Sequence, residues 1–321
     1  MKKIAMVFAC FALVSMTMKA QVAKIALQHN GNVTLYDADQ MPDVMNACVD
    51  GDTVYVNEGK FTNSFTISKK ISIIGSGQNS VLMGNVTVNI PGTPTLTAHL
   101  LDALNCHASI IFSAPTKGAK IRKCLFRGLY FNATTEDATI DRCYSCGGSS
   151  DPFKLSTYMK NVNIINSKIL NLYGDAASAA DVNFINCNIS SIYNYSSTYG
   201  QGKAIYINCI IGYWYSTSSN LPTACSFINC LCGNSTFTYG SYQNCWNYNN
   251  TSLIGSYVEC ILSSDQLQSS GYLGTDGTVV GIYGGTNPFT LDPMVPKVTE
   301  SSVKLDNDTK KLNVNLKVSA N

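Results

Sequence analysis

The stretch VNFINCNIS, residues 182–190, contains an Asn-Cys pair inside an alternation of apolar and polar residues. Related stretches recur along the chain, each with Cys or Ser at the same place. In register they align Cys124, Cys143, Ser167, Cys187, Cys209, Cys230, Cys245 and Cys260, at spacings of 15 to 24 residues. Such a period suits one coil of short strands and is too short for a pair of helices. The repeat therefore predicts a β-solenoid.

Each repeat reads as two short strands joined by a bend. Val182 and Phe184 alternate with their neighbours as on a strand, Ile185 and Asn186 interrupt the alternation, and the residues after them resume it. Asn tolerates the left-handed backbone conformation of a tight bend, and its amide can bond to a neighbour one coil away. We expect these side chains to stack as an internal or rim ladder of Asn166, Asn186, Asn208, Asn229 and Asn244.

The cysteines are predicted to fill the inward face beyond the bend as small apolar side chains. Ser167 replaces Cys in one repeat, which indicates that size matters more than thiol chemistry. Neighbouring strands lie about 4.8 Å apart, whereas a disulfide needs Cβ atoms about 3.8 Å apart. We therefore expect most thiols to be reduced, with oxidation as the alternative for an exported protein.

The first residues have the pattern of a secretory signal peptide: two lysines, an apolar run from Ile4 to Met18, and the small residue Ala20. This run is too short for a membrane span, and no other stretch approaches the required length of about 18 apolar residues. We expect a bacterial protein that is secreted or displayed at the cell surface. Without residues 1–20 the net charge is −1, so nothing recommends nucleic acid as a partner.

Residues 41–77 differ from the repeats. Their first eight residues, MPDVMNAC, place apolar side chains on one face of a short helix, and strands with Gly-rich turns follow. A helix there would cover the open end of a solenoid, whose uncapped strand edges would otherwise pair with other chains.

The C-terminal residues 297–321 alternate on both sides of a polar turn, DNDTKK, which predicts a β-hairpin. The hairpin would cap the second end of the solenoid or dock a surface partner or sorting machinery. The chain thus divides into a signal peptide over residues 1–20, a capped solenoid over 21–290 and a hairpin tail over 291–321.

The run GDTVYVNEGKFT at 51–62, followed by TISKKISIIGSG at 66–77, resembles the opening coil of the pectin-lyase-like superfamily, and the Asn-bearing coils to residue 264 fit the same pattern. The resemblance covers about residues 40–290. It implies a right-handed parallel β-helix. Together with the short N-terminal capping helix and the C-terminal β-hairpin predicted from the residues, this gives an all-β fold. It says little about activity, because the superfamily includes polysaccharide lyases, glycoside hydrolases, adhesins and members without known activity.

Catalytic chemistry finds little support in the sequence. Between residues 182 and 264 the only charged residues are Lys203 and Glu259, too few for general acid–base catalysis. A degenerate lyase or hydrolase site would have to lie within residues 116–181, around Arg127, Lys168 and Asp175, and a lyase would use calcium. These charges form no recognised motif, so a solvated outer face is the simpler interpretation.

We also expect neither a metal site nor a cofactor. The three histidines match no common zinc-binding spacing. They are His29, His99 and His107.

Tyrosine carries the most specific functional pattern. Six positions after an aligned Cys or Ser stand Tyr130, Tyr173, Tyr193 and Tyr215. Each follows a large apolar residue: Leu129, Leu172, Ile192 or Trp214. If these apolar residues face the core, alternation turns the tyrosines outward, with Asp175 and Asn194 beside them. The row would bind a sugar through ring faces and hydroxyl groups, or would form an aromatic ladder that only stabilises the sheet.

The leading hypothesis is a non-catalytic protein that binds a polysaccharide or a cell-surface glycan, or mediates another surface interaction, through the tyrosine face. The alternatives are the degenerate enzyme on residues 116–181 and a structural adhesin without a ligand groove.

Overall fold

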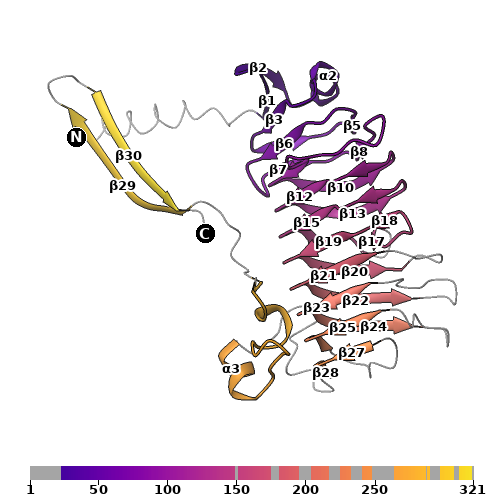
Figure 1. Ribbon diagram of the computed structural model, residues 1–321. Helices are drawn as coiled ribbons and strands as arrows, with labels where there is room; N and C mark the ends of the chain where they lie inside the picture. Colours follow the sequence, from indigo (N-terminus) through magenta and orange to yellow (C-terminus); the bar gives the residue numbers. More distant parts are fainter. Residues whose placement is uncertain are drawn as a thin grey trace, which may run out of the picture. The chain divides into compact units, whose positions relative to one another are not determined.

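The computed structural model describes residues 23–148, 151–174, 181–194, 204–216, 225–232, 241–247, 264–286, 288–289, 297–306 and 311–319. The expected signal peptide and the repeat around Cys260 lie outside these ranges. Apart from two short helices and one 3-10 turn, the regular elements of the described residues are β-strands (Figure 1). One compact unit ends at Phe289, and Thr290–Asn321 form a second unit.

The first unit is a parallel β-solenoid in which successive coils add strands to the same sheets. Sheet A runs in the order β2-β1-β3-β6-β9-β12-β15-β19-β21-β23-β25-β27. Its strands are β1 Lys24–His29, β2 Asn32–Asp37, β3 Thr53–Val56, β6 Ser72–Gly75, β9 Leu101–Asp102, β12 Lys120–Arg122, β15 Thr139–Asp141, β19 Val162–Ile165, β21 Val182–Ile185, β23 Ile205–Ile207, β25 Ser226–Ile228 and β27 Ser241–Gln243.

Sheet B lies across the interior and pairs the second strand of each coil, and a short sheet C completes several coils. The strands of sheet B are β4 Gly59–Phe61, β5 Phe65–Ile67, β7 Ser80–Leu82, β8 Val86–Val88, β10 Asn105–Phe112, β13 Leu125–Phe131, β16 Tyr144–Ser145, β17 Phe153–Lys154, β20 Lys168–Tyr173, β22 Asn188–Asn194, β24 Ile210–Ser216, β26 Leu231–Cys232 and β28 Trp246–Asn247. Those of sheet C are β11 Thr116–Lys117, β14 Thr135–Glu136 and β18 Met159–Lys160.

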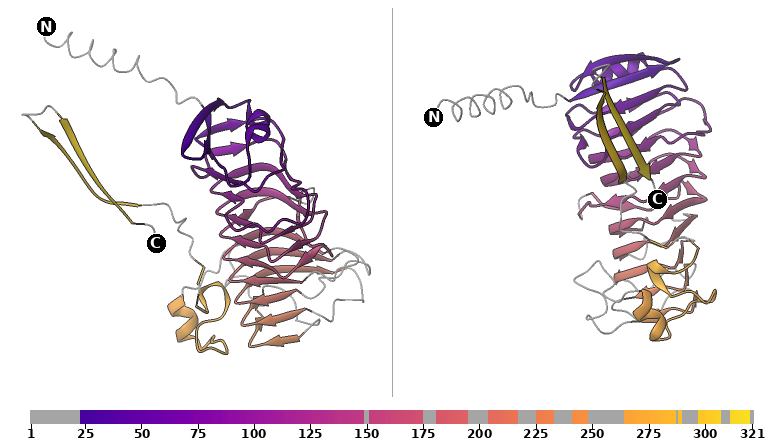
Figure 2. Two further views of the ribbon diagram at one scale, coloured as in Figure 1. Left: turned by 45° about the horizontal axis from the view of Figure 1, so that its top comes forward. Right: turned by 90° about the vertical axis from the view of Figure 1, so that its left-hand side faces the viewer.

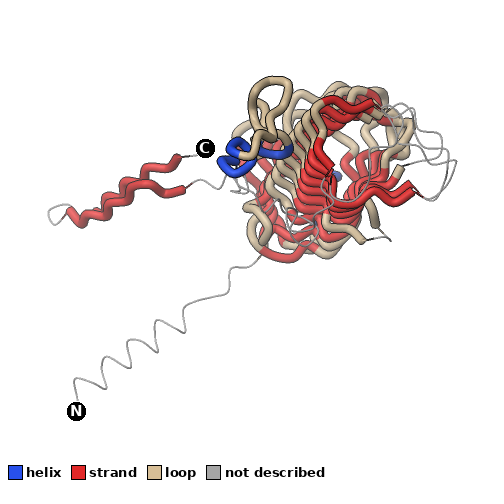
Figure 3. The backbone as a smooth tube through the Cα atoms, turned by 90° about the horizontal axis from the view of Figure 1, so that it is seen from below, coloured by secondary structure: helices blue, strands red, loops and turns tan. Residues whose placement is uncertain are grey.

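Parallel pairing keeps equivalent residues of successive coils in columns. Phe184 pairs with Tyr206, which pairs with Phe227, so one interior column runs through three coils. Their rings stack face to face, with centroids 4.8 Å and 4.9 Å apart. Viewed along the stack, the coils surround one continuous interior (Figure 3). The parallel solenoid predicted from the repeat is confirmed.

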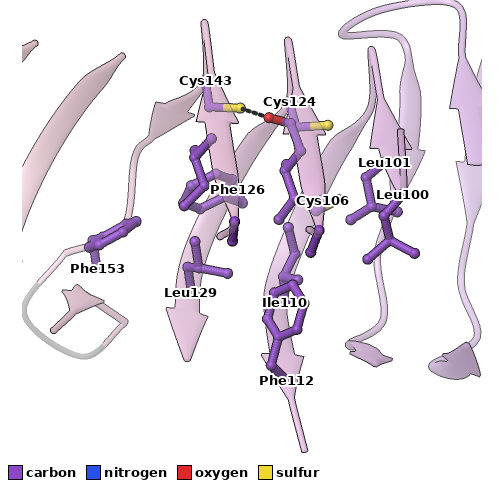
Figure 4. Close-up of a cluster of buried hydrophobic side chains, with 14 of the residues drawn as sticks. Leu100, Leu101, Cys106, Ile110, Phe112, Cys124, Phe126, Leu129, Cys143 and Phe153 are labelled. Atoms are coloured by element: carbon purple, nitrogen blue, oxygen red, sulfur yellow. Dashed lines mark hydrogen bonds between the residues drawn. The ribbon is translucent and has the colours of Figure 1, made fainter. Parts of the chain in front are cut away.

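The aligned cysteines lie inside this interior. Cys124, Cys143, Cys187, Cys209 and Cys230 are all buried. Figure 4 shows Cys124 and Cys143 on neighbouring strands among Phe126 and Leu129. For these five cysteines the predicted role as inward filler is confirmed, whereas Cys245 is only partly buried.

The same position also carries a hydrogen-bond donor. The thiols of Cys187 and Cys209 donate to the carbonyl oxygens two residues earlier, at 3.4 Å and 3.3 Å. The Ser167 hydroxyl donates to the equivalent carbonyl of Ile165 at 2.8 Å. Cys and Ser therefore share a polar role across the bend as well as a small size, which the prediction from size alone did not include.

The N-terminal end of the stack is built from an antiparallel pair and a helix. β1 pairs antiparallel with both β2 and β3, so sheet A ends in a hairpin that the sequence pattern did not reveal. Helix α2, Met41–Ala47, follows, and its Met41, Val44 and Met45 pack into the core. The predicted short helix is present with the predicted apolar face.

The bend between sheets A and B is a left-handed corner that repeats in eight coils. The residues with positive φ there are Ala103, Lys123, Arg142, Asn166, Asn186, Asn208, Asn229 and Asn244. Asn and Gly adopt this conformation most readily, so the Asn column predicted from the sequence has its expected backbone.

A later segment covers the lower part of this corner. It contains α3, Ser264–Ser269, and a 3-10 turn η1, Gly281–Tyr283, and lies beside the last coils (Figure 2). The Asn186 amide donates to the carbonyls of Ile282 at 3.1 Å and Gly284 at 2.7 Å. Asn186 therefore binds this segment. A side-chain hydrogen bond between coils is made three positions earlier, where the Asn183 amide donates to Asn163 Oδ1 at 3.0 Å.

The second unit contains one antiparallel pair, β29 Lys297–Asp306 and β30 Lys311–Ser319. Leu305 pairs with Leu312 and Val303 with Val314. The predicted hairpin is present. Among the described residues, no helix is long and apolar enough to cross a membrane.

Candidate functional site

The tyrosine positions form one column on sheet B. Tyr173 pairs with Tyr193, and Tyr193 pairs with Tyr215, on consecutive strands β20, β22 and β24. Lys154 pairs with Tyr173. Leu129 pairs with Phe153, which places Tyr130 beside Lys154. We call this column, from Tyr130 through Lys154 to Tyr215, the tyrosine row.

The neighbouring column shows which way the row faces. Leu129, Phe153, Leu172 and Ile192 are completely buried. Because side chains alternate along a strand, the next residues point away from the interior. Tyr130, Tyr173 and Tyr193 are accordingly half-buried on the outer face of sheet B. This is the orientation expected from the alternation in the sequence.

The rings of Tyr173 and Tyr193 stack on each other, with centroids 4.7 Å apart and an interplanar angle of 27°. Each ring thus turns one face toward the next coil. A ligand lying across the row would meet ring edges and hydroxyl groups rather than open ring faces. Because the two rings at this pair turn their faces toward each other, we expect a sugar to contact ring edges there rather than to stack on ring faces.

Tyr130 is held differently, because the strand has a glycine two residues earlier. A Cβ atom on Gly128 would lie 2.7 Å from the Tyr130 ring and 2.9 Å from the Ser109 hydroxyl, so the ring rests over the glycine. Burial, followed by the Asp151 carboxylate, raises the pKa of Tyr130, and its hydrogen bond with Ser109 opposes the shift. The hydroxyl group therefore stays protonated and able to donate at neutral pH.

Basic side chains accompany the row. Lys168 lies over the Tyr144 ring, with its Nζ 5.1 Å from the centroid. Arg127 pairs with Asp151 at 3.7 Å. With Lys154 these side chains give the face an excess of positive charge. Lys154 was not predicted as a site residue, because it follows Cys143 by eleven positions instead of six.

A second polar column flanks the tyrosines. Asn171 pairs with Ser191 on the neighbouring strand. The Asn171 amide donates to the Gly147 carbonyl at 2.9 Å, which fixes its orientation. The half-buried Asn171 places an amide group beside the aromatic row, whereas Ser191 is buried.

Part of the predicted site falls beyond what the structure describes. Asp175 lies outside the described ranges, as do the side chains of Asn194 and Tyr215, although their backbones belong to β22 and β24. The structure therefore brings together Tyr173 and Tyr193. Tyr130 lies in the same column but is separated from Tyr173 by Lys154.

None of the three histidines lies in the column of the tyrosines: His29 is on β1, His107 is on β10 and His99 precedes β9. His29 contacts Asp52, with Nδ1 2.7 Å from the carboxylate oxygen. In the part of the chain that the structure describes, no group of three or more His, Cys, Asp or Glu side chains is arranged to hold a metal ion.

Comparison of the chain with family models, curated proteins and solved structures finds no match. The architecture shown is a parallel β-solenoid, and the likeness to the pectin-lyase-like superfamily remains a prediction.

Proposed function

We propose that this is a non-catalytic carbohydrate-binding protein, exported by its signal peptide, which holds a polysaccharide or cell-surface glycan against the outer face of sheet B. The observation that carries the proposal is the tyrosine row, in which Tyr173, Tyr193 and Tyr215 occupy consecutive coils. Repetition along the solenoid axis suits a ligand that is itself a repeating chain.

The chemistry of the face supports this reading. Sugars are recognised by aromatic carbon surfaces together with hydroxyl and amide hydrogen bonds, and the row offers tyrosine ring edges and hydroxyl groups beside the half-buried Asn171. Stacking of Tyr173 on Tyr193 orders both rings before any ligand arrives. A preordered face loses less side-chain entropy on binding.

The further attributes belong to the same proposal. A right-handed coil, a pectin-lyase-like ancestry and a location outside the cell or on its surface are all expected from the sequence. They fit a glycan ligand, because extended glycans are abundant in that compartment. The ladder interpretation, in which the tyrosines only stabilise the sheet, is the competing hypothesis.

The test uses purified residues 21–321 on a panel of immobilised polysaccharides, with and without calcium, and measures retention and newly formed chain ends together. Binding without new ends supports the proposal. New ends would replace it with a lyase or hydrolase, and calcium dependence would favour the lyase. Absence of retention on the whole panel would leave the ladder or adhesin interpretation in its place.

Substitution then locates the surface. Tyr193→Ala should weaken retention while the thermal midpoint falls only slightly, because a cross-strand aromatic pair contributes about 0.2–1 kcal/mol. The matched control is Tyr55→Ala, which removes an exposed tyrosine from sheet A. Equal retention by both variants would contradict a binding role for the row.

A further inference from the structure

A second polar feature lies on the outer surface near the left-handed corner, on the coils above the buried asparagines. It is an open depression of about 280 Å³. Its polar lining comprises His99, Lys120, Arg122, Thr139, Asp141, Arg142 and Asn166. None of these residues belongs to the tyrosine row.

The lining carries more positive than negative charge. Asp102, Arg122 and Asp141 occupy one column of sheet A. Arg122 Nε donates to Asp102 at 3.1 Å, and Arg142 Nε donates to both Asp141 oxygens at 3.1 Å and 3.0 Å. Each carboxylate is thus matched by one guanidinium, and Lys120 adds a further cation.

Two buried polar atoms at the depression have no hydrogen-bond partner among the described residues: His99 Nδ1 and Asn166 Oδ1. An unsatisfied buried polar atom costs about 1–3 kcal/mol, so it usually marks a place where a ligand or water completes the bonding. Because both residues line the same depression, one ligand group there could meet both atoms.

The corner backbone points to the same place. Lys123 and Arg142 both have φ of 53°. The coils below use Asn at this position, and a left-handed conformation costs other residues about 1–2 kcal/mol. Strain of this kind is concentrated at functional sites. Cationic side chains therefore replace the favoured Asn on the two coils that frame the depression.

We propose that the depression binds a sulfate or phosphate ester, with the oxyanion against Arg122, Arg142 and Lys120 and a neighbouring hydroxyl group bonded to His99 and Asn166. A planar carboxylate is recognised best by the side edge of a guanidinium. Both arginines already use that edge for Asp102 and Asp141. A tetrahedral oxyanion, which accepts single hydrogen bonds from several directions, fits the remaining arrangement better.

His99 provides the readout. Burial, followed by Arg122, lowers its pKa, with Lys120 acting in the same direction and Asp102 and Asp141 opposing. The imidazole is therefore neutral at pH 7. A bound anion stabilises the imidazolium form, so the pKa of His99 should rise on binding.

The experiment follows the histidine ring signals of residues 21–321 by NMR across pH, at constant ionic strength. The separate additions are glucose, sodium acetate, glucose 6-sulfate and glucose 6-phosphate. Either ester should raise the pKa of His99, and the stronger of the two identifies the source of the oxyanion. Glucose and acetate should leave it unchanged. A uniform response of His29, His99 and His107, an equal effect of acetate, or no response to either ester would overturn the proposal.

Substitution completes the test. Arg142→Asn installs the residue that the lower coils carry at the same left-handed corner, so the fold should be retained. It should weaken binding of the effective ester about tenfold or more, since a charge-assisted hydrogen bond is worth about 1.5–3 kcal/mol. The control Lys60→Gln removes the positive charge of an exposed side chain on β4 and should bind as the wild type does. Unchanged affinity in Arg142→Asn would also overturn the proposal.

Discussion

The corner between sheets A and B has the same backbone in the upper and lower coils but meets different surroundings. In the lower coils Asn186, Asn208 and Asn229 are buried beneath the segment that contains η1. In the upper coils Lys123 and Arg142 adopt the same left-handed conformation and remain partly exposed beside the depression. The same left-handed corner is thus covered by a chain segment in the lower coils and partly open to solvent in the upper coils, and the side chain at the corner differs between the two.

The interior of the solenoid also differs between the upper and the lower coils. Ile121, Ile140 and Ile164 occupy one column of sheet A in the upper coils. The same column continues as Phe184, Tyr206 and Phe227 below. The lower coils therefore combine an aromatic stack inside with a covering segment outside. We expect their stability to depend on both features, which can be separated by substitution.

The largest effect should come from the aromatic stack. Tyr206→Ala removes a completely buried ring between Phe184 and Phe227 and should lower the free energy of unfolding by about 3–5 kcal/mol. The control Tyr242→Ala changes the next residue of the same column, which is 58% exposed and should cost less than about 1 kcal/mol. Denaturant titration measures the free energy of unfolding of both variants. Similar losses would show that the stabilisation by this column does not depend on how deeply each ring is buried.

The covering segment should give the next largest effect. Asn186→Ala removes two hydrogen bonds to Ile282 and Gly284 and puts Ala in a left-handed conformation, for a loss of about 2–4 kcal/mol. Asn244 has the same backbone but is exposed, so Asn244→Ala should show only the backbone cost of about 1–2 kcal/mol.

Limited proteolysis distinguishes the two contributions. Of these two variants, Asn186→Ala should speed cleavage within residues 264–286, because the Asn186 side chain donates two hydrogen bonds to that segment. If both variants were cleaved alike, the segment would not be fixed by this asparagine.

Alkaline pH should weaken the fold. Burial raises the pKa of Cys225 to about 12, and burial followed by Asp52 raises that of Cys48 to about 11. These folded-state values exceed the unfolded value of about 8.5, so the folded chain keeps protons that the unfolded chain loses. The contribution of these thiols to the free energy of unfolding should be fully present below about pH 8.5 and should decline progressively toward pH 11–12.

Urea unfolding between pH 7 and pH 10, under reducing conditions, measures this decline. Cys225→Ala should flatten the dependence, whatever its effect at neutral pH. A slope unchanged by this substitution would show that the thiol is not the titrating group. Thiol titration of the unfolded, unreduced protein checks in parallel that most cysteines are free, as the described cysteines are in the structure.

The smallest effect tests the upper corner. Lys123→Asn should raise the free energy of unfolding by about 0.5–1 kcal/mol, because Asn suits the left-handed conformation. Burial, followed by the nearby Arg122, lowers the pKa of Lys123, so the substitution also relieves an unfavourable charge. The urea midpoint measures the change. A loss of stability would mean that Lys123 contributes more through its contacts than its backbone costs.

Much of this molecule could be predicted from residue order because its contacts repeat. The spacing of Asn186-Cys187 and its equivalents predicts the coil, the bend and the buried column, since each depends on alternation over a few residues. The outward direction of Tyr173 and Tyr193 follows from the same alternation. The aligned positions before Cys124 and Cys143 also placed Lys123 and Arg142 in the asparagine column, a signal that sequence reasoning did not use.

The sequence by itself determined the parallel coils, the short N-terminal helix and the C-terminal hairpin. These features depend on the alternation of apolar and polar residues and on turn residues, which act between near neighbours in the chain. Only the tertiary structure decided that Ile282 and Gly284 cover Asn186, that Tyr173 and Tyr193 turn their ring faces to each other, and that His99 meets Arg122 and Asn166 at one depression. These contacts join residues far apart along the chain, and their geometry depends on how coils stack rather than on any local pattern.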